Sequence, residues 1–184
     1  MKKTTVRTRV LTGAVALAAL GAGTFGAMTA TAAPKGDGDV AQTAEARKPD
    51  TLTSTHLSID AATRAAEAAL HAAEKENQHV SVAVVDRNGT TVVTLRGDGA
   101  GPQSYESAQR KAFTAVSWNA PTSELAKRLA QAPNLKDIPG TLFLASGAPV
   151  ADKGAPIAGI GVAGAPSGDL DEKYAQAGAA SLGK

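Results

Sequence analysis

The sequence predicts an α+β fold, a single domain in which helices lie on the faces of an antiparallel sheet. Three observations lead to this class. Residues 80–96 carry the signal of a β-hairpin, several segments have apolar residues at helical spacing, and residues 156–163 form a glycine-spaced apolar strand. The order along the chain is helix, hairpin, two helices, strands and a final helix, without an internal repeat.

The hairpin is centred on Asn88-Gly89. This pair favours a two-residue type I′ turn, because both central positions of that turn need positive φ. Such a turn fixes the register and predicts the pairs Arg87–Thr90, Val85–Val92, Val84–Val93 and Val82–Leu95. The strand period of two gives one apolar face with Val82, Val84, Val93 and Leu95, and a small, half-polar face with Ser81, Ala83, Val85, Val92 and Thr94. We expect helices or a partner chain on both faces.

The first helix begins after Ser58, which suits the N-cap, with Leu57 as a hydrophobic staple. Its expected inward stripe is narrow and rich in alanine: Ile59, Ala62, Ala66, Ala69, Leu70 and Ala73. After the hairpin, the glycine-rich loop 97–102 offers backbone amides to an anion. It lacks the lysine of a phosphate-binding loop, so a plain turn is the better interpretation.

Two further helices are predicted at residues 104–117 and 123–131, with a break at 119–122 between them. Residues 141–144 are expected to form a short strand, and residues 146–149 a turn.

In the strand 156–163, the glycines let another part of the backbone approach closely. Ser167 is the expected cap of the last helix. The first turn of that helix is acidic, with Asp169, Asp171 and Glu172, and its expected inward stripe is Leu170, Tyr174, Ala177 and Ser181.

Residues 1–32 have the pattern of a secretory signal peptide: a basic start, an apolar run of small residues, and A-T-A at 30–32 as a cleavage site. A retained membrane anchor is the alternative, but the glycines and the cleavage site favour removal. We expect residues 33–53 to be a disordered linker, because they are rich in Gly, Asp and Pro without apolar periodicity. Residues 54–184 are then the folded domain of a secreted protein.

Removal of the signal peptide leaves fifteen basic and seventeen acidic residues, a net charge of about −2. This charge gives no electrostatic basis for nucleic-acid binding. The chain has no cysteine, and both methionines lie in the signal peptide, so disulfides and soft metal ligands are not expected in the exported domain. Its stability must come from its core or from oligomerisation.

No catalytic constellation stands out in the sequence. There is no G-x-S-x-G motif, no cysteine, and no serine in recognisable context with a histidine. Asp169 and Glu172 are three residues apart, so on a helix they share a face and can bind a cation loosely. An acidic first turn that favours the helix dipole is the commoner explanation of such a pair.

The three histidines are His56, His71 and His79. Haem iron takes His, Met, Cys or Tyr as axial donors, so the mature chain offers only these histidines and its two tyrosines. His56 precedes the helix cap and His79 precedes the hairpin, which are element ends where ligands are often met. His71 belongs to the exposed flank of the first helix. For any one of them alone, a solvated surface histidine is the commoner case.

Five segments carry a resemblance to a known family: L-S-I-D-A-A at 57–62, V-A-V-V-D-R-N-G at 82–89, Y-E-S-A-Q-R-K-A-F-T-A at 105–115, D-I-P-G-T-L-F-L at 137–144 and A-G-I-G-V-A-G-A at 158–165. In these segments the chain resembles the GlcG/HbpS-like haem-binding family, and most of all its secreted actinobacterial members. The resemblance implies a sheet-and-helix domain that assembles into a homo-octamer, binds haem and iron ions, and acts in redox sensing beside a membrane sensor histidine kinase.

The resemblance also implies site residues. The haem-linked positions are Thr141, His56 and His79, and a threonine oxygen is a weak iron donor, which implies an exchangeable haem site. The surface iron motifs of the family have the form acid-x-x-Glu. Asp169-x-x-Glu172 keeps this form, whereas Glu106-x-x-Gln109 departs from it, so a weaker second site is implied there.

We therefore expect a secreted haem- and iron-binding accessory protein rather than an enzyme. Two alternatives stay open: an enzyme of unknown small-molecule chemistry, which needs a pocket with convergent titratable groups, and a structural oligomer without a cofactor. A visible spectrum after addition of hemin distinguishes the three.

Overall fold

The computed structural model describes residues 44–183. The predicted signal peptide and most of the predicted linker lie outside these residues. The chain divides into two units, Met1–Glu45 and Ala46–Lys184. Residues 44–53 are exposed, and their one regular element is the short 3-10 helix η1 (Lys48–Asp50).

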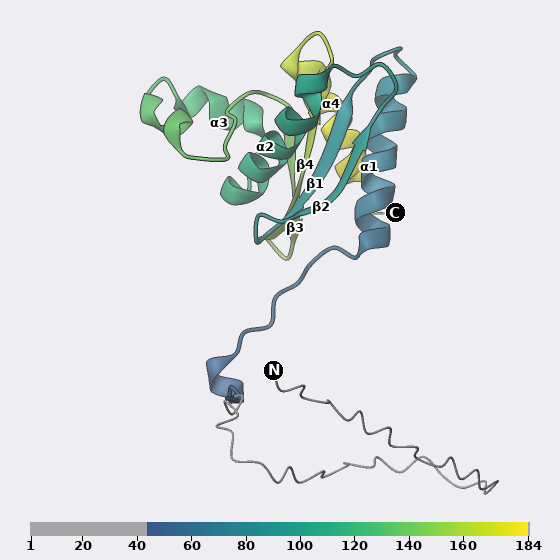
Figure 1. Cartoon of the computed structure of the whole chain (residues 1–184). Coiled ribbons are helices and arrows are strands. Elements are labelled where there is room, and N and C mark those ends of the chain that lie inside the picture. Colours follow the sequence, from purple (N-terminus) through teal and green to yellow (C-terminus); the bar gives the residue numbers. More distant parts are fainter. Residues whose placement is uncertain (1–43, 184) are drawn as a thin grey trace, which may run out of the picture. The chain divides into compact units, whose positions relative to one another are not determined.

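The second unit contains a four-stranded antiparallel sheet in the order β2-β1-β4-β3. Its elements are α1 (Ile59–Glu74), β1 (Ser81–Asp86), β2 (Thr91–Arg96), α2 (Pro102–Trp118), α3 (Thr122–Arg128), the 3-10 helix η2 (Pro133–Asp137), β3 (Gly147–Asp152), β4 (Ala155–Ala163) and α4 (Gly168–Ala180). Helices α1 and α4 pack on one face of the sheet, and α2 packs on the other (Figure 1). This architecture confirms the predicted α+β class.

The hairpin forms as predicted, but its turn differs. Asn88 does not have positive φ, and only Gly89 does, at 83°. The amide of Asp86 donates to the carbonyl of Thr90, so the loop has three residues, as in a type I turn followed by a left-handed glycine. The carboxylate of Asp86 selects this turn, because its Oδ1 accepts hydrogen bonds from the amides of Asn88 and Thr90 at 2.9 and 2.8 Å.

The longer loop introduces a bulge between Val84 and Val85 and so changes part of the register. Val84 pairs with Val93 as predicted, and so does Val82 with Leu95. The predicted pairs Val85–Val92 and Arg87–Thr90 are wrong, since Val85 faces Thr91. The bulge also moves Val92 to the apolar core under α1 and α4, away from the face predicted for it.

Helix α2 lies unusually close to the sheet because β4 presents glycines to it. A methyl group on Gly161 would overlap the carbonyl oxygen of Ala108, and one on Gly159 would overlap that of Ala112. The other residues of this contact are also small or β-branched, namely Ala83, Val85 and Val116. The predicted close backbone approach at the glycine strand is confirmed, and the approaching backbone is that of α2.

Helix α1 begins as predicted, with the amide of Ala61 donating to Ser58 Oγ at 3.2 Å. Its buried stripe is made entirely of alanine: Ala62, Ala65, Ala66, Ala69 and Ala73. Ile59 is 57% exposed, so its predicted inward position is wrong: it is the first residue of the helix, where its neighbours Ser58 and Asp60 are exposed as well. Helix α4 packs beside α1, and the hydroxyl of the fully buried Tyr174 donates to Glu76 Oε2 at 2.9 Å. Burial, together with this carboxylate, raises the pKa of Tyr174 to about 12.

The segment between α3 and β4 departs most from the prediction. Residues 141–144 do not form a strand, and residues 147–149 of the predicted turn belong to β3 instead. Proline is tolerated in β3 because this strand lies at the sheet edge, where Pro149 pairs with Gly159. Residues 141 and 142 hydrogen-bond to side chains of α2 rather than to a strand. Helix α3 ends at Arg128, before the predicted end at residue 131.

The contact between α2 and β4 gives a direct test of the fold. Gly161→Ala should lower the free energy of unfolding by about 2–3 kcal/mol, because the new methyl group meets rigid helix backbone. Urea denaturation of the parent and the variant measures this difference. Gly183→Ala, at a position with nothing within 4 Å, is the control and should change stability little. A Gly161→Ala protein as stable as its parent would contradict the close packing.

Candidate functional site

Thr141 is placed in a surface segment but is itself buried. The residues before it, 136–140, are exposed, whereas Thr141 is 2% exposed. Gly140 has φ of 80° and turns the chain inward at this point. The hydroxyl of Thr141 donates to the carbonyl of Ile138 at 2.7 Å, which leaves its oxygen lone pairs as the potential donor to a metal.

The ring of Phe113, on α2, links this segment to the hairpin turn. One edge of the ring lies against Gly140, where an added methyl group would stand 3.5 Å away. The other edge lies against Gly89, where the corresponding distance is 2.8 Å. Thr141 therefore belongs to the end of the molecule that carries the hairpin turn.

His56 borders the same turn from the side of α1. Its Nδ1 lies 3.5 Å from Oδ2 of Asp86, the residue whose carboxylate holds the turn. Its Nε2 is 2.7 Å from the hydroxyl of Ser54, so both ring nitrogens face polar partners. Iron binding by His56 would have to replace one of these contacts.

His79 lies at the opposite end of β1. Its Nδ1 is 2.7 Å from the carbonyl oxygen of Asp98, and because a carbonyl only accepts, Nδ1 must be the protonated nitrogen. The proton on Nδ1 leaves the lone pair of the neutral ring on Nε2, which makes no hydrogen bond to any described residue. A backbone carbonyl that fixes the tautomer is the arrangement often found behind metal-binding histidines. Of the two predicted histidines, His79 is thus the better prepared donor. His71 is exposed, as expected.

The sheet keeps the predicted haem-linked residues apart. Six residues of β1 separate the surroundings of His79 from the turn near His56 and Thr141. At about 3.3 Å per residue this is roughly 20 Å, too far for both ends to reach one iron. The structure brings His56 and Thr141 to one end and leaves His79 at the other.

The predicted iron-binding carboxylates also differ in their surroundings. Asp169 is exposed, but Glu172 is 8% exposed, and its two oxygens accept from the amide and the hydroxyl of Ser123 at 2.9 and 2.6 Å. Glu172 thus caps the first turn of α3. Glu106 is exposed, and its Oε1 lies 4.0 Å from Nη1 of Arg110. Among residues 44–183, no three His, Asp or Glu side chains form a group able to hold a metal ion.

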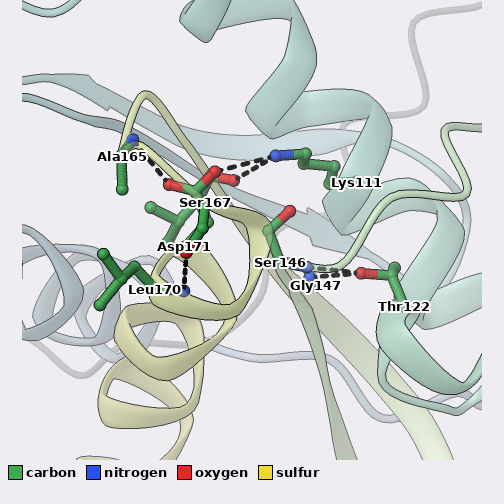
Figure 2. A network of polar contacts seen from close by, with 9 residues as sticks. Lys111, Thr122, Ser146, Gly147, Ala165, Ser167, Leu170 and Asp171 are labelled. Carbon is green, nitrogen blue, oxygen red and sulfur yellow. Dashed lines mark hydrogen bonds and ion pairs between the residues drawn. The ribbon is translucent and has the colours of Figure 1, made fainter.

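A buried ion pair, which the sequence analysis did not anticipate, joins α2 to α4 (Figure 2). Nζ of Lys111 lies 3.0 Å from Oδ2 of Asp171, and both side chains are almost fully buried. Lys111 also donates to the carbonyl of Val162 at 3.2 Å, and Asp171 Oδ1 accepts from the amide of Ala165 at 3.0 Å. The pair therefore ties both helices to the end of β4.

The ladder between β3 and β4 ends at the same place, since its last pair is Gly147–Gly161. The amide of Val162 donates to the carbonyl of Ser146, but the amide of Ser146 turns away and donates to Thr122 Oγ1 at 2.8 Å. The φ of Ser146 is 149°, a strained value for a residue with a side chain. Its hydroxyl is buried and has no hydrogen-bond partner.

One signal could have revealed this ion pair. Lys111 stands at helical spacing within the alanine face 108–115, between residues that the pattern places inward. A charged residue there is normally assigned to the solvent side, because charges are rarely buried without a partner. The partner lies 60 positions further along the chain, where sequence spacing alone cannot identify it.

The described residues enclose no detected pocket. Within the same part of the chain, no helix combines the length and the apolar character that crossing a membrane requires.

Comparison with known proteins gives a consistent result. The family described as "Haem degrading protein HbpS-like" matches residues 57–180. A crystal structure of a double mutant of Streptomyces reticuli HbpS is 76% identical, with a TM-score of 0.77, over 79% of this chain and 99% of that chain. A crystal structure of HbpS is 78% identical, with a TM-score of 0.76, over 77% of this chain and 100% of that chain. A haem complex of PduOC is 28% identical, with a TM-score of 0.63, over 68% and 94% of the two chains. The comparison with curated proteins gave no match.

The buried ion pair should be costly to break from one side. Lys111→Met should lower the free energy of unfolding by about 3–5 kcal/mol, because it leaves the carboxylate of Asp171 buried without its counter-charge. The double variant Lys111→Met/Asp171→Asn should recover much of this loss, since no charge is then left unpaired. Thermal and urea unfolding of the three proteins measure the effect. If the double variant loses as much stability as the single variant, the loss does not come from an unpaired buried charge.

Proposed function

The chain belongs to the HbpS-like family, and from this membership we propose that it is a secreted haem-binding protein that also takes up iron ions. The observation that carries the proposal is the likeness to HbpS over nearly the whole of that chain, together with the haem complex of the more distant PduOC. The proposed role is the haem- and iron-binding role expected from the sequence.

Thr141, His79 and His56 are the residues we propose to hold haem. The donor chemistry fits, since His79 presents an unpaired Nε2 and Thr141 retains oxygen lone pairs. When bound, the haem iron supplies the redox chemistry. His79 lies far from the other two within one protomer, so we propose that it serves a different haem or a haem shared with a neighbouring copy.

The family description names haem degradation, so membership in it does not exclude an enzymatic role. We propose binding as the primary activity, with degradation as the second candidate. Hemin-loaded protein kept with a reductant in air separates the two. A Soret band that persists indicates binding alone, whereas progressive loss of the band with release of iron indicates degradation.

We further propose that the protein modulates the ectodomain of a membrane sensor histidine kinase in response to haem, iron or oxidative stress. This part and the secretion rest on the family resemblance and on the signal-peptide pattern of residues 1–32.

Hemin titration tests the haem site. Thr141→Ala should shift the Soret band or weaken binding, and His79→Ala should remove part of the affinity because it removes a prepared imidazole donor. His56→Ala should have a smaller effect, since both of its ring nitrogens already face polar partners. His71→Ala is the matched control and should titrate like the parent. If all four variants bind hemin as the parent does, the haem lies elsewhere.

Iron binding gives a separate test. Asp169→Ala/Glu172→Ala should lower ferrous or ferric ion uptake and leave hemin binding intact. Gln109→Glu should raise uptake, because it restores a carboxylate three residues after Glu106. Isothermal titration of the hemin-free proteins measures both. Because Glu172 also caps α3, Ser123→Ala serves as the control for loss of that cap alone. Unchanged uptake in Gln109→Glu would show that the second motif does not bind iron.

The assembly is the last part of the proposal. The protein should form a large homo-oligomer, an octamer by family resemblance, since an exported domain without cysteine gains stability by burying surface against other copies. Multi-angle light scattering at micromolar concentration measures the mass. A monomer under these conditions would contradict the proposal.

A further inference from the structure

The burial of Thr141 conflicts with its proposed role as a haem ligand. An iron atom can bond only to an oxygen that it can approach, and Thr141 is 2% exposed. Its neighbours on the sequence are not covered in this way: residues 136–140 are exposed, and so is Leu144, at 56%. Thr141 is thus an inward-facing residue in a segment that otherwise lies at the surface.

Two side chains of α2 hold this segment in place. Arg110 Nη2 donates to the carbonyl oxygen of Thr141 at 2.8 Å. One turn further along the helix, Thr114 Oγ1 accepts from the amide of Leu142, also at 2.8 Å. These two bonds bind the carbonyl and the amide of a single peptide group, the one between Thr141 and Leu142.

The hydroxyl of Thr114 is set for this contact. It donates its proton to the carbonyl of Arg110 at 2.7 Å, so a lone pair is left for the Leu142 amide. Among the described residues, no other hydrogen bonds join residues 138–144 to another element, and the remaining ones lie within the segment or connect it to the preceding η2. The residue after Leu142, Phe143, packs edge-on against Trp118, with ring centroids 5.2 Å apart.

We propose that Arg110 and Thr114 form a latch that holds residues 140–142 in a closed form, in which Thr141 is buried, and that haem reaches Thr141 only in the open form. The proposal rests on the proposed function, because it takes Thr141 as a haem ligand. Gly140, at positive φ, and the buried ring of Phe143 mark the two ends of the part that moves. Haem affinity then depends on the fraction of protein in which the latch is open.

Thr114→Val tests the latch, because valine has the shape of threonine without the oxygen. In the closed form the variant leaves the Leu142 amide without a partner, whereas in the open form that amide reaches water. The open fraction should rise about fivefold, the effect of losing one neutral hydrogen bond. The apparent affinity for hemin should rise by about the same factor as long as the open form stays in the minority.

Hydrogen exchange followed by mass spectrometry on the hemin-free protein reads the latch directly. Peptides that contain Leu142 should exchange about fivefold faster in Thr114→Val. Thr114→Ser keeps the oxygen and should behave like the parent. Ser117→Ala is the matched control, since the Ser117 hydroxyl makes the same bond to the carbonyl four residues before it but no hydrogen bond to the segment. Arg110→Gln, read only by exchange, should act in the same direction as Thr114→Val.

Hemin titration completes the test. The gain in affinity of Thr114→Val should disappear in the double variant Thr114→Val/Thr141→Ala, because opening then exposes no donor. Unchanged exchange at Leu142, or hemin affinity that is equal or weaker in Thr114→Val, would overturn the latch. If Thr141→Ala alone leaves the hemin spectrum and affinity unchanged, the haem assignment is wrong, and exchange in the hemin-free protein still decides whether the latch exists.

Discussion

The absence of side chains at Gly159 and Gly161 determines how the rest of this domain is arranged. These two positions of β4 let the backbone of α2 lie directly on the sheet, in contact with the carbonyls of Ala108 and Ala112. Three side chains of α2 hydrogen-bond to other elements: Arg110 and Thr114 to the Thr141 segment, and Lys111 to α4.

Burial of the charges of Lys111 and Asp171 costs desolvation free energy, and well-placed polar partners offset this cost. Each side chain has a second hydrogen bond to the backbone, so neither charge depends on the other alone. The ladder between β3 and β4 ends at the pair Gly147–Gly161, and just beyond this pair the carbonyl of Val162 accepts from Lys111. The Ser146 hydroxyl has no hydrogen-bond partner, and it is the one such atom detected among the described buried side chains.

The antiparallel sheet also sets the distances between the candidate ligands. His79 precedes β1, whereas the hairpin turn that His56 and Thr141 border follows it, so the length of that strand separates them. A haem that uses donors from both ends therefore needs a second copy of the chain. Under the proposed function, this geometry would make haem binding depend on oligomerisation, two properties that the resemblance implied independently.

The sequence by itself determined the α+β class, the hairpin, the caps at Ser58 and Ser167, and the glycine strand that admits a neighbouring backbone. These features depend on short-range patterns: side-chain periodicity, turn residues and N-cap hydroxyls. The sequence also supplied the family resemblance and with it the proposed site residues. Those residues could be named from local motifs, but their exposure and their distances from one another could not.

Only the tertiary structure decided the features that join distant parts of the chain. The carboxylate of Asp86 replaced the expected two-residue turn with a three-residue loop. Residues 141 and 142 hydrogen-bond to side chains of α2 and not to a neighbouring strand. Strand β3 formed instead at 147–152, where the composition is typical of a turn. Lys111 found its counter-charge 60 residues away. In each case the hydrogen-bond or ion-pair partner of a polar group comes from another element. The local sequence does not indicate which element the fold places beside that group.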